Sequence, residues 1–405
     1  MTIRRFAALV LAVMLCLGVN GVFAEQENEA YQQVLERAQM ALGNNLRLKN
    51  VLERAAAGEN ITVALIGGSI TEGAGAANYN ECYAMRVGDG LRERFGENIS
   101  VINAGVGGTP STFGWIRYAR DVEARVPETD PDGLPDIVFI EFSVNDWGEP
   151  TNHQCYESMV KAILEQPNHP AVILVFAVFK NGWNLQDDLK KVGQAYDLMM
   201  VSIRDGAYPA MDDLWTKAEW FSDDYHPTSL GHQVMADCIL GTIDAAVAAP
   251  TAEQDIDLDV KPAFGLGYMK LRRIFASDKD LDEIALQRGS FNRDDQGSYR
   301  NYPVGRVCGQ NFSHTALADN DPLSFTATFS KLMIGWRTAN GFGSAEVLID
   351  GKVVRTLTVP SGSWGQTEVT LVLNDKEAAE HTVEIRMAED SLNKQFTVTC
   401  MAFAE

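Results

Sequence analysis

Ser69, Asp223 and His226 are residues whose types allow nucleophilic catalysis. A serine hydroxyl is a weak nucleophile, and it becomes reactive when a neighbouring base accepts its proton. Histidine suits this role because its ordinary pKa lies near neutral pH. A carboxylate can bind the second ring nitrogen and stabilise the protonated ring. Asp223 precedes His226 by three residues and could bind this second nitrogen, although the adjacent Asp224 could orient the histidine instead. We predict that Ser69, His226 and Asp223 act together.

Two further segments contain groups that could stabilise an oxyanion. Gly108 belongs to the glycine-rich stretch 104–111 (AGVGGTPS), and Asn145 follows an apolar run that ends at Phe142. The tetrahedral intermediate of acyl transfer needs preorganised hydrogen-bond donors, each typically worth about 3 kcal/mol of barrier. We expect the backbone N–H groups of Ser69 and Gly108 and the side-chain amide of Asn145 to be these donors. Glycine at 108 permits close approach because it has no Cβ.

Ser69 also has a possible structural role. Ser69 and Glu72 have the spacing of a capping box, in which a serine begins a helix and the acidic residue bonds back to it. The two roles are compatible, because a helix start behind the serine directs free N–H groups toward a developing oxyanion. The catalytic prediction therefore depends on the partners that the later segments supply.

Alternating strand and helix patterns place these residues at strand ends. The predicted strands are 61–65, 99–103, 137–142 and 171–179, with a weaker one near Val201. The predicted helices are 27–58, 79–95, 114–124, 156–165, 185–198 and 229–246. This alternation predicts a three-layer α/β/α domain with a doubly wound, mostly parallel sheet. In a flavodoxin-like order the first strand lies between the second and third, so the exits with Ser69, Gly108 and Asn145 meet at one carboxyl edge.

The pattern changes after residue 248. Residues 249–262 are polar and acidic, with a proline near each end, which is typical of a linker. Beyond them, strand patterns separated by turn residues predict an all-β sandwich over 263–405. The expected strands are 333–337, 345–349, 353–359, 367–373, 382–387 and 396–402, with turns at Asp350-Gly351 and Asn374-Asp375. We therefore expect an α/β domain over 25–248, a linker and a β-sandwich domain.

The first 24 residues have the features of a secretory signal peptide. Arg4 and Arg5 precede a largely apolar stretch, residues 6–19, and small residues at 22–24 suit cleavage. The apolar stretch is short for a membrane span, and no later stretch is long and apolar enough for one. We therefore expect a mature protein that begins at Glu25 and is secreted or located in the cell envelope.

Charge and cysteine content exclude several functional classes. The formal net charge of −21 disfavours binding to nucleic acid and to anionic membrane surfaces. The five cysteines outside the signal are sparse and odd in number, so we expect no disulfide framework, although Cys308 and Cys400 could pair. No Cys/His spacing resembles a zinc site, and Gly73-x-Gly75 lacks the remainder of a dinucleotide-binding motif. No metal or cofactor is expected.

Taken together, the motifs resemble those of the SGNH (GDSL-like) hydrolase family. The matching residues are Gly68-Ser69 in GGSIT, Gly108 in NAGVGGT, Asn145 in SVND, and Asp223 with His226 in DDYHP. The resemblance covers about residues 45–246. The commonest first motif of the family has Asp where this chain has Gly68, and this variant is similar to the carbohydrate-esterase branches more than to the lipase branches. The resemblance implies the flavodoxin-like α/β/α fold, the Ser-His-Asp triad and the oxyanion hole named above.

This resemblance implies a secreted serine esterase that removes acetyl or other short acyl groups from polysaccharides or oligosaccharides. The predicted sandwich is similar to jelly-roll carbohydrate-binding modules. Trp147, just past Asn145, could stack on a sugar ring or lie in the core; Trp364 has the same alternatives, and Trp336 is more typical of core. A lipase, a thioesterase or an O-acyltransferase could use the same triad. A non-catalytic carbohydrate-binding protein on the same scaffold is the alternative from another class.

Overall fold

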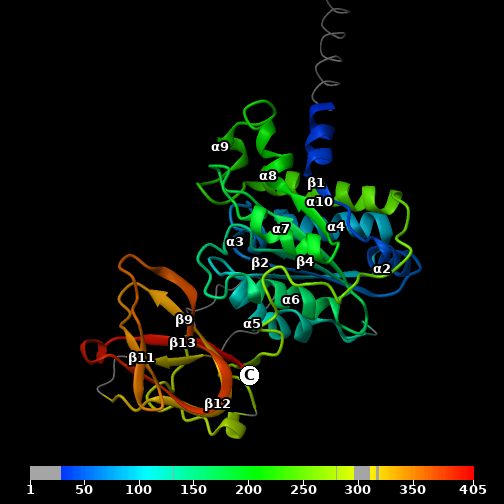
Figure 1. Cartoon of the computed structure of the whole chain (residues 1–405). Coiled ribbons are helices and arrows are strands. Elements are labelled where there is room, and N and C mark those ends of the chain that lie inside the picture. The colour runs from blue at the N-terminus through cyan, green and yellow to red at the C-terminus, as the bar shows by residue number, and fades with distance from the viewer. Residues whose placement is uncertain (1–28, 131, 280, 296–310, 316–318) are drawn as a thin grey trace, which may run out of the picture.

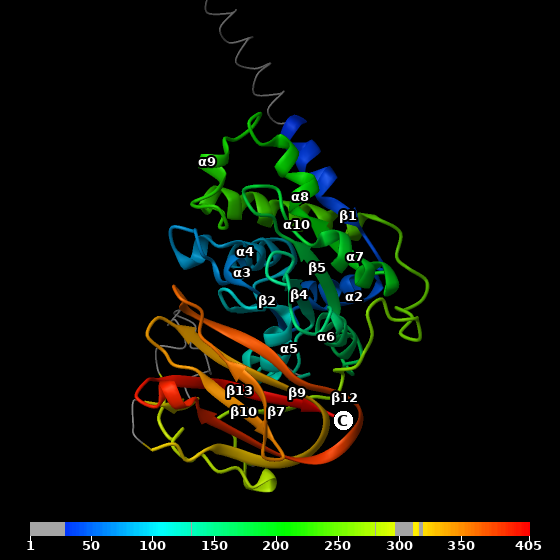
Figure 2. The same cartoon turned by 60° about the vertical axis from the view of Figure 1, so that its left-hand side comes forward.

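The computed structural model describes residues 29–130, 132–279, 281–295, 311–315 and 319–405. An α/β part with a mostly parallel sheet comes first in the chain, and an all-antiparallel β part follows it (Figures 1 and 2). The predicted signal peptide, residues 1–24, lies outside the described residues. Within the ranges given above, no helix is both long and apolar enough to cross a membrane.

The sheet of the α/β part has six strands in the order β1-β6-β5-β4-β2-β3. Their bounds are β1 Gln39–Ala41, β2 Ile61–Gly67, β3 Ile99–Gly105, β4 Ile137–Glu141, β5 Ala171–Phe176 and β6 Met199–Ser202. Strands β2 to β6 are parallel, and β1 pairs with β6 in the antiparallel direction. Because β2 lies between β3 and β4, the predicted flavodoxin-like order is confirmed. Gly67 is in register with both Gly105 and Glu141, so the three strands end at the same level.

Helices cover both faces of this sheet and complete three layers (Figures 1 and 2). The core on one face contains residues of α2 Leu46–Ala56, α4 Tyr83–Phe95 and α10 Ser229–Ala248. The core on the other face contains residues of α5 Ser111–Asp121, α6 Gln154–Leu164 and α7 Gln186–Ala195. Short helices in the connections are α3 Ser69–Glu72, η1 Tyr79–Glu81, η2 Glu123–Arg125, α8 Ile203–Gly206, η3 Tyr208–Ala210 and α9 Lys217–Trp220. Strands β2 and β5 are buried along their whole length, which explains their continuous apolar sequence.

The helix predicted over residues 27–58 is wrong as a single element. Residues 29–38 are helical, β1 follows, and α2 begins only at Leu46. Gly43 lies between β1 and α2 with a φ of +59°, and a Cβ there would lie 2.3 Å from the carbonyl carbon of Leu198. The chain therefore turns tightly against the start of β6, a contact that side-chain periodicity does not reveal.

The C-terminal part is antiparallel throughout. Its sheet has the order β11-β10-β12-β9-β13-β7, and β8 pairs with β13. The bounds are β7 Arg272–Ile274, β8 Phe312–His314, β9 Leu323–Ala339, β10 Ala345–Ile349, β11 Lys352–Leu357, β12 Trp364–Met387 and β13 Phe396–Ala404, with short helices η4 Leu281–Ile284 and η6 Glu389–Ser391. The long strands β9 and β12 contain register shifts and curve around an apolar core, consistent with the predicted sandwich (Figure 1).

The two turns predicted in this part have different outcomes. Asp350 and Gly351 both have positive φ, 52° and 74°, and connect β10 to β11 as the sequence predicted. The turn predicted at Asn374-Asp375 is wrong, because β12 continues past this point with only a register shift against β9. The predicted strands 367–373 and 382–387 are therefore parts of one long strand.

The antiparallel part packs directly against the α/β part. Met333 of β9 and Cys400 of β13 belong to the same apolar cluster as Trp115 of α5. The indole Nε1 of Trp115 donates a 2.7 Å hydrogen bond to the carbonyl of Tyr268, and the guanidinium carbon of Arg273 lies 4.4 Å from the Trp115 ring centroid. This shared apolar cluster fixes how the second sheet approaches the carboxyl edge of the first.

The segment predicted as a linker, residues 249–262, lies along the surface of the α/β part. Arg47 of α2 forms an ion pair with Asp255, with a distance of 2.6 Å between Nε and Oδ1. Just beyond the segment, the carboxylate of Glu157 accepts hydrogen bonds from three successive backbone N–H groups, residues 263–265. The connection between the two parts is therefore held in place at several points.

Candidate active site

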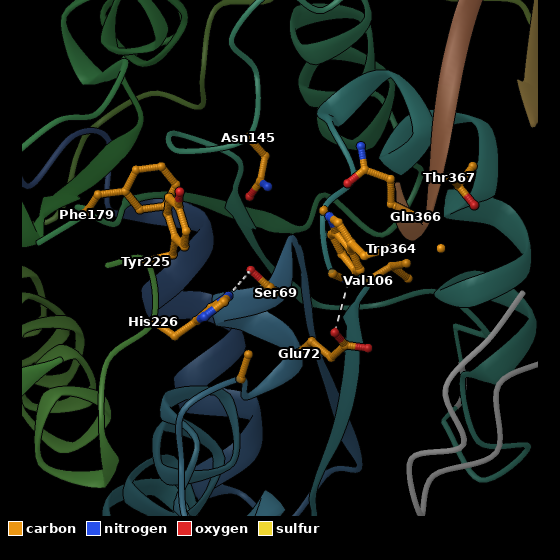
Figure 3. Close-up of a pocket in the computed structure, with 14 residues that line it drawn as sticks. Ser69, Glu72, Val106, Asn145, Phe179, Tyr225, His226, Trp364, Gln366 and Thr367 are labelled. Atoms are coloured by element: carbon orange, nitrogen blue, oxygen red, sulfur yellow. Dashed lines mark hydrogen bonds between the residues drawn. The ribbon is translucent and has the colours of Figure 1, made fainter. Parts of the chain in front are cut away.

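Ser69 lies where the central strand of the parallel sheet ends. Strand β2 ends at Gly67, Gly68 is the cap residue, and Ser69 is the first residue of the single-turn helix α3. The capping-box interpretation of Ser69 is wrong, since Gly68 occupies the cap position and the cap forms no side-chain hydrogen bond. The Ser69 hydroxyl instead lies 3.0 Å from Nε2 of His226 (Figure 3).

His226 is held on its other side by Asp223. The distance between His226 Nδ1 and Asp223 Oδ2 is 2.8 Å, and Asp223 Oδ1 accepts hydrogen bonds from the backbone N–H groups of Tyr225 and His226. Partial burial raises the pKa of Asp223, but the hydrogen bonds from His226 and from these N–H groups outweigh it and lower the pKa below its ordinary value. An ionised Asp223 accepts from Nδ1–H, which leaves Nε2 free to accept the proton of Ser69.

Asp224, the alternative partner of the histidine, points elsewhere. Its side chain is 82% exposed and lies 4.0 Å from the ammonium group of Lys180. The geometry therefore brings Asp223, and not Asp224, to His226. The Asp223 side chain is oriented by a tight turn, in which its Oδ1 accepts hydrogen bonds from two backbone N–H groups.

Gly108 lies in the loop after β3 and faces the same cleft as Ser69. Its φ of +70° is one that a residue with a Cβ rarely adopts. A Cβ at this position would also lie 2.8 Å from the Trp364 ring, which comes from the antiparallel part. Glycine is required here by the backbone conformation and by this approach of the second sheet.

Asn145 follows β4 and also lines the cleft, near Ser69 (Figure 3). Its side chain packs against Gly68, where a Cβ would lie 2.0 Å from Asn145 Oδ1. This contact explains why the position before the serine is glycine in this chain. Ser69, Gly108 and Asn145, which are far apart in the sequence, are thus brought to one cleft.

Glu72 was not predicted as a functional residue beyond the capping box. Its Oε2 accepts a 3.0 Å hydrogen bond from the backbone N–H of Gly107, and its side chain is buried at the cleft (Figure 3). The contact connects the helix of Ser69 to the loop of Gly108. The available signal in the sequence was an acidic residue three positions after the serine. The capping-box pattern, however, predicts a bond from Glu72 to the backbone of Ser69 and not to Gly107.

Two fully buried carboxyl groups lie next to these loops. Glu141, at the end of β4, accepts a 3.1 Å hydrogen bond from the Thr71 hydroxyl, and burial raises its pKa to about 7 despite that bond and one from the backbone of Gly68. Asp146 accepts a 2.7 Å bond from the backbone N–H of Ser111, and burial raises its pKa to about 8. Glu141 therefore binds the backbone of Gly68, the residue before Ser69, and Asp146 binds the backbone N–H at the start of α5.

The cleft has a volume of about 470 Å³ and is lined by both parts of the protein. The α/β part contributes Ser69, Glu72, Ala74, Val106, Gly107, Gly108, Asn145, Phe179, Tyr225 and His226. The antiparallel part contributes residues 364–367, at the start of β12. Figure 3 shows Trp364 and Gln366 on one side of Ser69 and Tyr225 and Phe179 on the other.

The tryptophans considered from the sequence have different positions. Trp336 is buried and stacks on Phe396, with ring centroids 5.5 Å apart, so it belongs to the core as expected. Trp364 is 59% exposed and lines the cleft. Trp147 is 80% exposed and does not belong to the core, but it is not among the residues that line this cleft. The role of Trp364 was left open by the sequence because only the packing of the two parts places it near Ser69.

His232, a further histidine of the α/β part, is bound to backbone groups and not to the Ser69 site. His232 is buried, accepts from the backbone N–H of Tyr83 and contacts the Ala74 carbonyl, and burial lowers its pKa to about 4. Among the described residues, no group of three or more His, Cys, Asp or Glu side chains is arranged to hold a metal ion. The suggested Cys308–Cys400 pair involves Cys308, which lies outside the described residues.

This chain is similar in sequence or structure to several known proteins. Residues 65–234 match the GDSL-like Lipase/Acylhydrolase family. The crystal structure of a two-domain esterase (CEX) active on acetylated mannans has 27% sequence identity and a TM-score of 0.79, over 92% of this chain and 99% of that chain. A structure of a two-domain esterase of the same description, co-crystallized with mannopentaose, has 26% identity and a TM-score of 0.77, over 92% and 98% of the two chains. No curated protein matches this chain significantly.

The structural similarity extends over both parts of the chain, and the family match includes the residues from β2 to α10 that bring Ser69, Asn145 and His226 together. The match to the GDSL-like lipase/acylhydrolase family therefore identifies residues 65–234 as a domain of this type, and the protein is a carboxylic ester hydrolase with a second, antiparallel β domain.

Proposed function

We propose that this protein is a serine esterase that removes acetyl groups from polysaccharides or oligosaccharides, with acetylated mannan as the first substrate to test. The observation that carries the proposal is the 3.0 Å contact between Ser69 Oγ and His226 Nε2 in an open cleft. The similar two-domain esterase is described as active on acetylated mannans, which supports this substrate class.

The first half of the reaction forms an acetyl-enzyme. Ser69 Oγ attacks the acetyl carbonyl carbon while its proton passes to His226 Nε2, and Asp223 stabilises the resulting imidazolium. The backbone N–H groups of Ser69 and Gly108 and the amide of Asn145 stabilise the oxyanion. The bond between the carbonyl carbon and the sugar oxygen then breaks, and His226 gives its proton to that oxygen as the sugar hydroxyl leaves.

The second half of the reaction restores the enzyme. A water molecule attacks the carbonyl carbon of the acetylated Ser69, and its proton passes to His226. The second tetrahedral intermediate collapses, acetate leaves, and His226 returns a proton to Ser69 Oγ. The net reaction consumes one water and yields acetate and a free sugar hydroxyl.

The space beside Ser69 favours a short acyl group. Glu72, Ala74, Val106 and Gly107 are among the residues that line the cleft with Ser69. A Cβ at Gly107 would lie 3.5 Å from the Cβ of Ser69 and 2.6 Å from the Glu72 carboxylate, so this carboxylate lies close to the serine. A long acyl chain would need a continuous apolar channel, and a carboxylate on the wall disfavours it.

The proposal is tested by acetate release from acetylated mannan, xylan and pectin, with p-nitrophenyl esters of two to twelve carbons as small substrates. We expect hydrolysis of acetyl esters by the wild type and none above background by Ser69→Ala. A preference for long acyl chains would identify a lipase, and transfer of acetyl to an added sugar in place of water would identify an acyltransferase. Absence of hydrolysis of every ester would contradict the proposal.

We also propose that the enzyme acts outside the cytoplasm, with residues 1–24 removed as a signal peptide. The positively charged start, the apolar stretch and the small residues at 22–24 support this proposal. Expression of the full chain in a secreting host, followed by sequencing of the N-terminus of the exported protein, tests it. A start at Glu25 is expected, whereas retention of the first 24 residues would contradict it.

A further inference from the structure

Three aromatic side chains of the α/β part pack against one another at the edge of the cleft. The rings of Phe179 and Trp183 are stacked, with centroids 5.6 Å apart and an interplanar angle of 25°. Tyr225 meets Phe179 edge to face, with centroids 5.1 Å apart and an angle of 75°. Phe179 and Tyr225 both line the cleft, and Figure 3 shows them together on the side of Ser69 opposite Trp364. We call Phe179, Trp183 and Tyr225 the aromatic wall.

Backbone hydrogen bonds hold the two loops of the aromatic wall together. The N–H of Lys180 donates to the carbonyl of Asp224, with a distance of 3.2 Å, which connects the loop after β5 to the loop of His226. Within the first loop, the N–H of Phe179 donates to the carbonyl of Trp183, at 3.1 Å. The N–H of Tyr225 donates to Asp223 Oδ1, at 2.7 Å. The aromatic wall is therefore preorganised, which reduces the conformational entropy lost when a ligand binds.

Tyr225 presents a large surface to solvent from this fixed position. Tyr225 is 55% exposed, whereas Phe179 and Trp183 are partly buried. It directly precedes His226, so a group in contact with Tyr225 lies close to the reacting ester. An exposed aromatic ring held rigidly at the edge of a cleft is typical of a binding contact, because it offers apolar area at little entropic cost.

We propose that the aromatic wall, through Tyr225, is a binding subsite for a sugar ring adjacent to the acetylated one. The axial C–H groups of a pyranose give it an apolar face that matches the face of an aromatic ring, and its hydroxyl groups stay in contact with water. This inference rests on the proposed function, and it adds that the enzyme recognises residues within a sugar chain. Acetylated oligosaccharides are then better substrates than acetylated monosaccharides.

The test compares Tyr225→Ala and Tyr225→Phe with the wild type on two substrates, an acetylated manno-oligosaccharide of about five units and p-nitrophenyl acetate. The measured quantity is the ratio of kcat/KM for the oligosaccharide to kcat/KM for the small ester. We expect this ratio to fall about five- to tenfold in Tyr225→Ala, the usual scale of one aromatic contact, and to stay within about twofold in Tyr225→Phe. Phe179→Leu, which removes the ring behind Tyr225, is expected to reduce the ratio by an intermediate amount.

Several outcomes would overturn the inference. An unchanged ratio in a folded Tyr225→Ala variant, or an equal loss on both substrates, means that Tyr225 does not bind the sugar chain. A wild type that hydrolyses acetylated mannose as well as the oligosaccharide also contradicts it. These results differ from failure of the proposed function, in which the wild type shows no Ser69-dependent hydrolysis of either substrate.

Discussion

The carboxylate of Glu72 accepts a hydrogen bond from the backbone N–H of Gly107, with 3.0 Å between Oε2 and N. Glu72 belongs to the same helical turn as Ser69, and Gly107 directly precedes Gly108. The bond therefore joins the helix of the proposed nucleophile to the loop of a proposed oxyanion donor. Because the Glu72 side chain is buried, this connection is protected from competition by water.

Glu72→Ala is expected to lower kcat on p-nitrophenyl acetate by roughly tenfold, since it removes an acceptor worth about 1.5–3 kcal/mol and frees the Gly107 loop. Glu72→Gln keeps an acceptor oxygen but loses the charge, and a smaller decrease is expected. Glu93→Ala, an exposed glutamate on α4, is the control and should leave kcat unchanged. Equal kcat in the three variants would show that Glu72 does not position the loop.

Ser69→Ala and His226→Ala are each expected to lower kcat by at least ~10³-fold, because either change removes the activated nucleophile. The double variant should be no slower than the slower single variant, since the two residues act as one unit. Steady-state kinetics on p-nitrophenyl acetate measure all three. Losses that multiply in the double variant would show that the two side chains act independently.

Asp223→Asn is expected to lower kcat by roughly 10²–10⁴-fold, because an amide at Nδ1 favours the wrong tautomer of His226. Asp224→Asn is the matched change on the neighbouring residue, whose side chain is exposed, and activity should stay within about twofold of the wild type. Both variants are assayed with the same small ester. A larger effect of Asp224→Asn than of Asp223→Asn would reverse the assignment.

Trp364→Ala is expected to raise KM for acetylated mannan about fivefold, because it removes an exposed ring from the cleft side that the second domain supplies. Trp336→Ala is a useful comparison, since it removes a buried ring and should instead lower the free energy of unfolding by about 3–5 kcal/mol. Kinetics and thermal unfolding are measured for both. A large loss of stability in Trp364→Ala without a change in KM would contradict the prediction.

The buried Glu141 is expected to make stability depend on pH. Its folded-state pKa is raised to about 7 from an ordinary 4.5, so the unfolded chain ionises first as pH rises and the folded state loses stability across this window. Glu141→Gln cannot ionise, and its Tm relative to the wild type should therefore increase between pH 5 and about 7.5. Thermal unfolding at several pH values checks this, and a constant difference in Tm would show that Glu141 does not titrate in this range.

Much of the first domain was predictable because its signals are local. A buried parallel strand has a continuous apolar sequence. A polar residue or glycine at its end lies at the carboxyl edge of the sheet, independent of the conformation of the connecting loops. The runs that became β2, β3 and β4 were therefore recognised, and their flavodoxin-like order is confirmed. The break at Gly43 and the continuation of β12 past Asn374 were missed, because each depends on a partner strand distant in the sequence.

The sequence by itself determined the types of the proposed reactive groups and their order along the chain: Ser69, Gly108, Asn145, Asp223 and His226. Only the tertiary structure decided that Asp223 reaches His226 while Asp224 turns away, that Glu72 bonds to Gly107, and that the cleft includes Trp364. The physical reason is that these relationships depend on the directions of side chains and on the packing of two domains. The apolar cluster around Trp115 brings β12 to the edge of the first sheet, and no pattern in either segment specifies that contact.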